Sequence, residues 1–224
     1  LFFAATLVAV ALSPDPMSGL PQVRKFFVFA MLPLVFTTFE NLHQIRALIF
    51  AWGGIGALSA GRSLLQFFDR RYEALHQNAN TYDFYLDGRI TGFASHWMTF
   101  GGEEMIVCIL LVAVVLFAAD RRSRIIAGVL SPVICIALVL GLTRSIFMLG
   151  LPVGLIYLFW NWKRTAILAV PAAAAAVMTI TPFYVRERAL SVLRPHGSLD
   201  SNTHRSVTRR TGWEMVKAHP WFGL

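Results

Sequence analysis

Long apolar runs separated by short polar segments dominate the chain, and this pattern predicts helices that cross a membrane. Six or seven runs qualify: Leu1–Leu12, Phe26–Thr38, Ile45–Leu65, Met98–Ala119, Ile125–Leu142, Ser145–Trp160 and Thr165–Tyr184. A segment inside lipid must satisfy its backbone hydrogen bonds internally, so each run is expected to be helical. The predicted fold class is therefore all-α, a polytopic transmembrane helix bundle.

Composition agrees with a membrane protein, since 56% of the residues are hydrophobic and 14% are charged. The formal net charge is +8. In a soluble protein this charge would indicate a nucleic-acid partner. Here the basic residues stand between apolar runs, where they orient the helices and meet anionic membrane lipids, so no nucleic acid is expected.

Two short basic loops predict the orientation of the helices. Asp120–Arg124 and Asn161–Thr165 are separated by two spans and should both be cytoplasmic. The turn Thr143–Ser145, the segment Gln66–Ser95 and the tail Val185–Leu224 then lie on the opposite face. In a bacterium that face is the periplasm.

This topology predicts two regions: a transmembrane bundle over residues 1–184 with a periplasmic loop at 66–95, and the start of a larger periplasmic loop at 185–224. Arg24 and Lys25 would then be periplasmic, against the rule, and an extra hairpin near the N-terminus would explain them. The chain begins within an apolar run and ends within a motif at Gly223-Leu224. We therefore interpret it as a fragment whose second region is truncated.

Arginines on the non-cytoplasmic side are the candidate functional residues. Arg144 lies in a tight turn between two spans, and Arg89 lies just before the Met98–Ala119 run. A third group, Arg205, Arg209 and Arg210, lies on a helix expected to start near His204 and to end near His219-Pro220. Arginines grouped outside a bilayer suit a phosphate-bearing anion. Contact with lipid headgroups or solvent is the alternative for each of them.

Other titratable residues are weaker candidates for a functional site than these arginines. Glu103 and Glu104 stand near the start of a span, where they are expected to pair with an outside arginine or else mark only a shallow helix start. His96, His196 and His204 are candidate proton carriers. The two cysteines have no partners at metal-ligand spacing, and no phosphate-binding glycine loop is present, so neither a metal nor a cofactor is expected.

Three motifs resemble those of the O-antigen ligase and O-antigen polymerase family. Gly141–Gly150 (GLTRSIFMLG) is similar to the family's turn, commonly Ser-Arg-Gly, between two spans. Arg89–Gly101 (RITGFASHWMTFG) is similar to its Arg-x-x-Gly stretch entering a helix. His204–Gly223 (HRSVTRRTGWEMVKAHPWFG) is similar to its Arg-x-x-x-Trp and His-Pro-x-x-Gly segment, with Arg209 in place of tryptophan.

The resemblance implies a GT-C-like glycosyltransferase of the bacterial inner membrane, with several spans and a site facing the periplasm. Its members transfer a glycan from undecaprenyl pyrophosphate, without a metal and with inversion, to lipid A–core, a growing polysaccharide or protein. Arg144 and Arg205 would then hold the pyrophosphate as catalytic residues, with Arg89, Arg210 and His204 binding substrate. The family's favoured histidine would lie beyond Leu224, so residues 1–224 alone are expected to be inactive.

Two other functions stay open from the residues alone. A permease for an anionic solute would also present arginines, although it should show internal repeats and charges near the bilayer midplane. A structural membrane subunit would leave the arginines scattered. The choice among ligase, polymerase and protein glycosyltransferase is not encoded in any recognisable motif.

Overall fold

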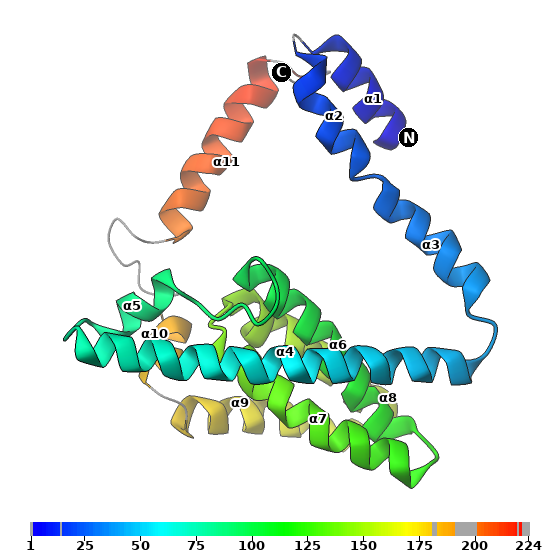
Figure 1. The fold of residues 1–224 in the computed structure, drawn as a ribbon, viewed down its shortest axis with the longest axis vertical. Helices are drawn as coiled ribbons and strands as arrows, with labels where there is room; N and C mark the ends of the chain where they lie inside the picture. The colour runs from blue at the N-terminus through cyan, green and yellow to red at the C-terminus, as the bar shows by residue number, and fades with distance from the viewer. Residues whose placement is uncertain (1, 14, 181–182, 191–200, 219, 221–224) are drawn as a thin grey trace. The chain divides into compact units, whose positions relative to one another are not determined.

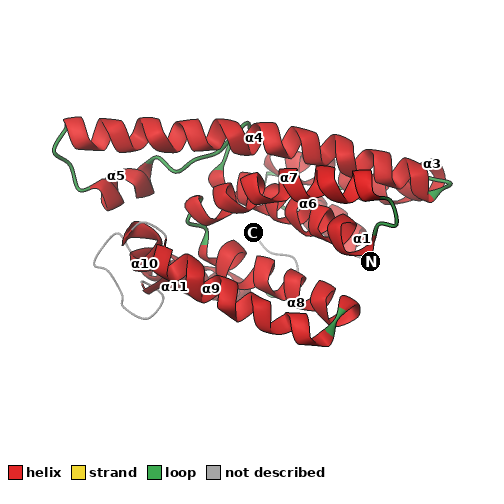
Figure 2. Cartoon of the chain, turned by 90° about the horizontal axis from the view of Figure 1, so that it is seen from below, coloured by secondary structure: helices red, strands yellow, loops and turns green. Residues whose placement is uncertain are grey.

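The computed structural model describes residues 2–13, 15–180, 183–190, 201–218 and 220. The elements among these residues are helices, as Figure 2 shows, which confirms the predicted all-α fold class. The chain forms two compact units, one of residues 1–44 with 194–224 and one of residues 45–193. The predicted division at residues 184 and 185 stays a prediction.

The first unit contains the helices at the two ends of the chain (Figure 1). They are α1 (Phe2–Leu12), α2 (Pro16–Arg24), α3 (Phe27–Thr38) and α11 (Ser201–Ala218). The ring of Phe26, just before α3, lies 5.5 Å from that of Phe2 and 4.9 Å from that of Phe3 between centroids. The bounds of α11 agree with the helix predicted from near His204 to near Pro220.

The second unit carries the other helices, and α4 enters it from the first. They are α4 (Leu42–His76), α5 (Thr81–Asp87), α6 (Trp97–Phe117), α7 (Arg121–Leu140), the π-helix η1 (Ser145–Gly150), α8 (Leu151–Trp162), the 3-10 helix η2 (Arg164–Leu168), α9 (Ala169–Ile180) and α10 (Phe183–Leu190). Helices α6 and α7 form an antiparallel pair, and their buried side chains supply much of the core. Val107 and Leu111 from α6 and Ile134 and Leu138 from α7 are members of that core.

Among the described residues, four helical segments are long and apolar enough to cross a membrane: α4, α6, α7 and the continuous segment Ser145–Trp162. Three further apolar helices are shorter: Phe2–Leu12, Phe27–Thr38 and Arg164–Val177. Four of the seven predicted runs are therefore long enough to span as single helices. The chain is a polytopic helical membrane protein, as its apolar pattern predicted.

The polar segment 66–95 differs from the loop that the sequence predicted. Residues 66–76 continue α4, and α5 occupies part of the remainder. Phe67 and Ala74, seven residues apart on one face of the helix, are buried, whereas Asp69 and Arg71 are exposed. This amphipathic spacing holds α4 against the unit beyond the end of its apolar run.

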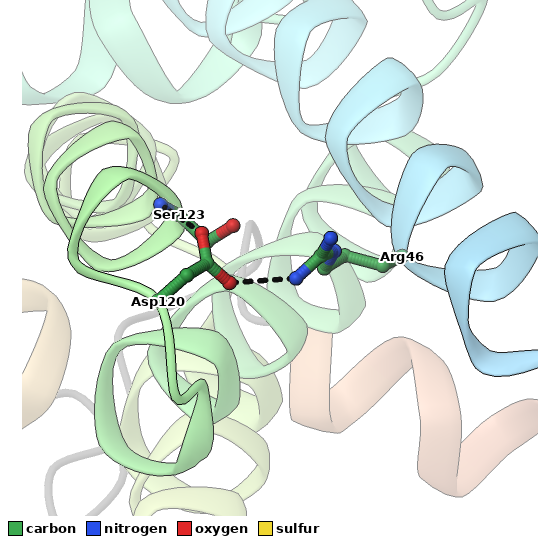
Figure 3. A network of polar contacts seen from close by, with 3 residues as sticks. All are labelled: Arg46, Asp120 and Ser123. Atoms are coloured by element: carbon green, nitrogen blue, oxygen red, sulfur yellow. Dashed lines mark hydrogen bonds and ion pairs between the residues drawn. The ribbon is translucent and has the colours of Figure 1, made fainter.

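Asp120 fixes the connection between α6 and α7 (Figure 3). Its Oδ2 accepts a hydrogen bond of 2.9 Å from the backbone N–H of Ser123, so Asp120 is the N-cap of α7. Its Oδ1 lies 2.6 Å from Nη1 of Arg46, near the start of α4. The bonds from Ser123, followed by the charge of Arg46, lower the pKa of Asp120 below its ordinary value of 3.8.

Two variants should separate the cap from the ion pair. Asp120→Asn keeps a side-chain oxygen for the Ser123 N–H, whereas Asp120→Ala removes both interactions, so the melting temperature should fall in the order wild type, Asn, Ala. Folding lowers the pKa of Asp120. The stability advantage of wild type over Asp120→Asn is therefore fully present at a pH above 3.8, the ordinary pKa of this carboxyl, and is lost as the pH falls through its pKa in the folded protein. Thermal unfolding in detergent measures both effects. Equal melting temperatures for the two variants would exclude a capping role.

Candidate anion-binding site

Arg89 is held by a short loop, residues 88–96, that joins α5 to α6. The side chain of Gln66 on α4 accepts two backbone hydrogen bonds from this loop, 3.0 Å from the N–H of Thr91 and 3.1 Å from that of Gly92. Ile90 is buried in the core beside Arg89. The loop is therefore fixed to α4 at Thr91 and Gly92, close after Arg89, which fixes the position of Arg89 as well.

The guanidinium group of Arg89 stacks on Trp97, the first residue of α6, with 3.9 Å between Cζ and the ring centroid. Its Nε and Nη1 atoms are buried and have no hydrogen-bond partner among the described residues. A cation–π contact satisfies the face of the guanidinium group and leaves its N–H donors unused. Buried donors without acceptors are unfavourable, and an anion would supply the acceptors.

Arg144 follows the turn that ends α7. In this turn Leu142 adopts a left-handed conformation with φ 51° and is fully buried. Two contacts from other helices support the turn. The hydroxyl of Tyr85 on α5 donates to the carbonyl of Leu140 at 2.7 Å, and Nε of Arg188 on α10 donates to the carbonyl of Leu142 at 3.3 Å.

Arg188 is a functional candidate that the sequence analysis missed. It belongs to α10 and is 9% exposed, a low value for an arginine. Burial, followed by the positive charges of Arg188 and Arg144, lowers the pKa of Arg89 from its ordinary value of 12.5 to about 10. The three side chains thus share one electrostatic environment. We refer to Arg89, Arg144 and Arg188 as the arginine cluster.

The arginine cluster brings together the loop after α5, the turn after α7 and helix α10, three segments far apart in the sequence. Nearby positive charges in a partly buried region disfavour the charged state of Arg89. With its pKa at about 10, Arg89 still carries its proton at neutral pH. The arrangement is therefore suited to an anion of more than one charge, such as a pyrophosphate group.

The other predicted arginines lie on α11, which belongs to the first unit. Arg205 and Arg209 are exposed, and Arg210 forms an exposed ion pair of 3.2 Å with Glu214 one turn later. The side chain of His204 lies outside the described residues. That Arg205, Arg210 and His204 join Arg144 in one site stays a prediction.

The remaining titratable candidates have other surroundings. His96 caps α6, because its Nδ1 accepts a hydrogen bond of 3.1 Å from the N–H of Met98, and His196 lies outside the described residues. Among the described residues Glu103 and Glu104 form no ion pair, so the pairing expected for them is not seen. The described part of the chain also contains no group of three metal-binding side chains.

Comparison with known proteins adds one finding. Residues 130–224 match the family model for O-antigen ligase. No curated protein matches the chain, and no solved structure does. The matched region contains Arg144, Arg188 and Arg205 and begins after Arg89. The resemblance expected from the motifs is therefore confirmed over residues 130–224, where the chain is similar to the O-antigen ligase family.

Proposed function

We propose that this protein transfers a glycan from undecaprenyl pyrophosphate to lipid A–core or to a growing polysaccharide, on the periplasmic side of the inner membrane. The family match indicates glycan transfer in the biosynthesis of lipopolysaccharide or surface polysaccharide. The apolar helices of this chain indicate a multi-pass membrane protein. A lipid-linked substrate would reach such a protein directly from the bilayer.

The proposed reaction is a single displacement. The acceptor hydroxyl oxygen attacks the anomeric carbon, the bond from that carbon to the pyrophosphate oxygen breaks, and the hydroxyl proton passes to a base. Attack from the side opposite the leaving group inverts the anomeric centre. Negative charge develops on the pyrophosphate as the bond breaks, and fixed positive charges beside it lower the barrier.

Arginine is suited to this task because it stays protonated and binds phosphate oxygens through two parallel N–H groups. We assign Arg144 and Arg205 to the pyrophosphate as catalytic residues, with Arg89, Arg210 and His204 as substrate-binding residues. Arg188 supports the turn before Arg144 through the Leu142 carbonyl and adds positive charge to the cluster. Metal ions and nucleotides have no part in this proposal.

The observation that carries the proposal is the state of Arg89. Its Nε and Nη1 atoms are buried without hydrogen-bond partners among the described residues, beside two further positive charges. A protein that used Arg89 only for stability would gain from pairing its N–H groups with carboxylates or carbonyls. An anionic substrate accounts for the unused donors.

The test uses a strain that lacks the gene, complemented with the full-length protein or with its Arg144→Ala or Arg205→Ala variant. Each variant should reduce acceptor-linked polysaccharide at least tenfold on a gel, and undecaprenyl-linked glycan should accumulate on the periplasmic face. Arg71→Ala, an exposed arginine on α4, is the matched control and should leave the gel unchanged. Wild-type polysaccharide in both variants would exclude the proposal. Accumulation of the lipid-linked glycan on the cytoplasmic face would favour a transporter.

A further inference from the structure

A second polar site lies between α4 and α6, apart from the residues of the arginine cluster. It is a cavity of about 350 Å³ closed on one side by the loop before α6. Its walls include two aromatic rings, two hydroxyl groups and two carboxylates: Trp52, Phe93, Ser59, Thr99, Glu103 and Glu104. Nothing in the proposed transfer step so far uses this cavity.

Glu104 is the central residue of the cavity. It is 3% exposed, and its Oε2 atom is buried with no hydrogen-bond partner among the described residues. Gly56 on α4 faces this atom, since a Cβ at that position would lie 3.0 Å from Oε2. The hydroxyl of Ser59 is the neighbouring polar group on the same helix. The absence of a side chain at Gly56 therefore lets α4 pack closely against this carboxylate oxygen.

The cavity lies near the end of α6 that carries Arg89. Glu104 is seven residues after Trp97, which corresponds to about 10 Å of helix. Trp97 is also the residue on which Arg89 stacks. A ligand in the cavity would therefore occupy the same end of this unit as an anion on the arginine cluster.

The lining combines groups that a sugar ring requires. Each sugar hydroxyl both donates and accepts, and the cavity offers carboxylate acceptors together with the hydroxyls of Ser59 and Thr99. Arg62 already lies 4.8 Å from the centroid of the Phe93 ring, so Trp52, 38% exposed, is the aromatic wall offered to a ligand. A site for an ammonium group would need the carboxylates and rings but not the hydroxyl donors.

We infer that this cavity binds a sugar residue, with Glu104 accepting hydrogen bonds from ring hydroxyls and Trp52 packing on the apolar face of the ring. The inference rests on the proposed glycan transfer for the source of the sugar. That source is either the glycan on the lipid carrier or the sugar of the acceptor. Both present the same pyranose chemistry, and binding experiments distinguish them.

The experiment measures binding by calorimetry to the full-length protein in lipid nanodiscs. One probe is the oligosaccharide released by mild acid from the strain's lipid-linked glycan, and the other is the core oligosaccharide released from its lipid A–core. Neither probe carries pyrophosphate, so the arginine cluster does not contribute through that group. Binding of one probe and not the other identifies the source of the sugar.

Glu104→Leu and Trp52→Ala should each weaken binding of that probe about tenfold or more. An apolar residue of similar size at a buried position preserves folding, and Trp52 lies partly exposed at the cavity wall, so the second variant remains informative if the first is unstable. Asp69→Asn, an exposed carboxylate on α4 outside the cavity, is the matched control and should bind as wild type.

Three results would overturn the inference: no binding of either probe to wild type, equal binding by wild type and Glu104→Leu, or binding of ethanolamine that is lost in Glu104→Leu. The last result would identify a cation site. Failure of glycan transfer in the complemented strain, with sugar binding intact, would instead remove the proposed function and leave the sugar site in place.

Discussion

Arg89→Met is expected to reduce glycan transfer by about a hundredfold or more while leaving the melting temperature of the protein unchanged or higher. The loss follows from removing a positioned donor beside the developing charge of the leaving group. The stability result follows because wild type buries two guanidinium nitrogens that have no hydrogen-bond partner in the described part of the chain, next to the charges of Arg188 and Arg144. Methionine fills similar space without burying N–H groups that lack acceptors and without repulsion from the neighbouring positive charges.

The two measurements are a transfer assay in membranes and thermal unfolding in detergent. Arg89→Lys is the informative companion, since lysine keeps the charge but loses the planar group that stacks on Trp97 and binds an anion through two nitrogens. It should recover only part of the activity. Full activity in Arg89→Met would exclude a role for Arg89 in transfer. A marked fall in its melting temperature would show that Arg89 stabilises the fold.

Gly92→Ala is expected to destabilise the protein by about 2 kcal/mol or more and to lower the yield of folded protein sharply. Gly92 has φ 56°, in the left-handed region where a side chain is strained. A Cβ there would also lie 2.8 Å from Cε2 of Phe100, a buried ring, and would collide with the hydroxyl of Ser59. Both neighbours are buried.

Gly102→Ala is the matched control, because it lies in α6 and a Cβ there would meet nothing within 4 Å. Alanine in place of a helical glycine should leave stability unchanged or raise it by up to about 1 kcal/mol. Thermal unfolding followed by size-exclusion chromatography compares the two variants. Equal behaviour would mean that the loop holding Arg89 tolerates a different backbone conformation.

Several features could be predicted because they depend on residues close together in the sequence. The helix α11 and the turn with Arg144 follow from local signals: capping residues, a proline after the helix end and a polar interruption between apolar runs. The apolar runs predicted α6 and α7 to within a few residues. The extension of α4 through residues 66–76 was missed, because its charged face resembles a loop unless Phe67 and Ala74 are known to be buried.

The role of Arg188 depends on contacts that no local pattern contains. In the sequence it is one of several charged residues after an apolar run. In the structure its Nε reaches the carbonyl of Leu142, 46 residues earlier, and that carbonyl is exposed to it by the left-handed turn. The spacing of apolar residues along the sequence does not reveal a contact between residues so far apart.

The surroundings of Glu104 could not be predicted for a related reason. A carboxylate in a span indicates an ionic partner when only charge is considered. The structure instead places Glu104 opposite Gly56 of α4, where the close approach of two helices decides which groups meet.

The π-helix η1 after Arg144 has a consequence for how this region tolerates changes in length. In η1 the N–H of Leu151 bonds to the carbonyl of Ile146, five residues earlier, so the helix accommodates a surplus residue without interrupting its hydrogen bonds. Loss of one residue from Ser145–Gly150 would let the segment relax to an α-helix continuous with α8. The same loss would turn Arg144 by about 100° about the helix axis relative to α8. A deletion of a single codon here would therefore spare the folding of the helix and redirect the arginine that precedes it.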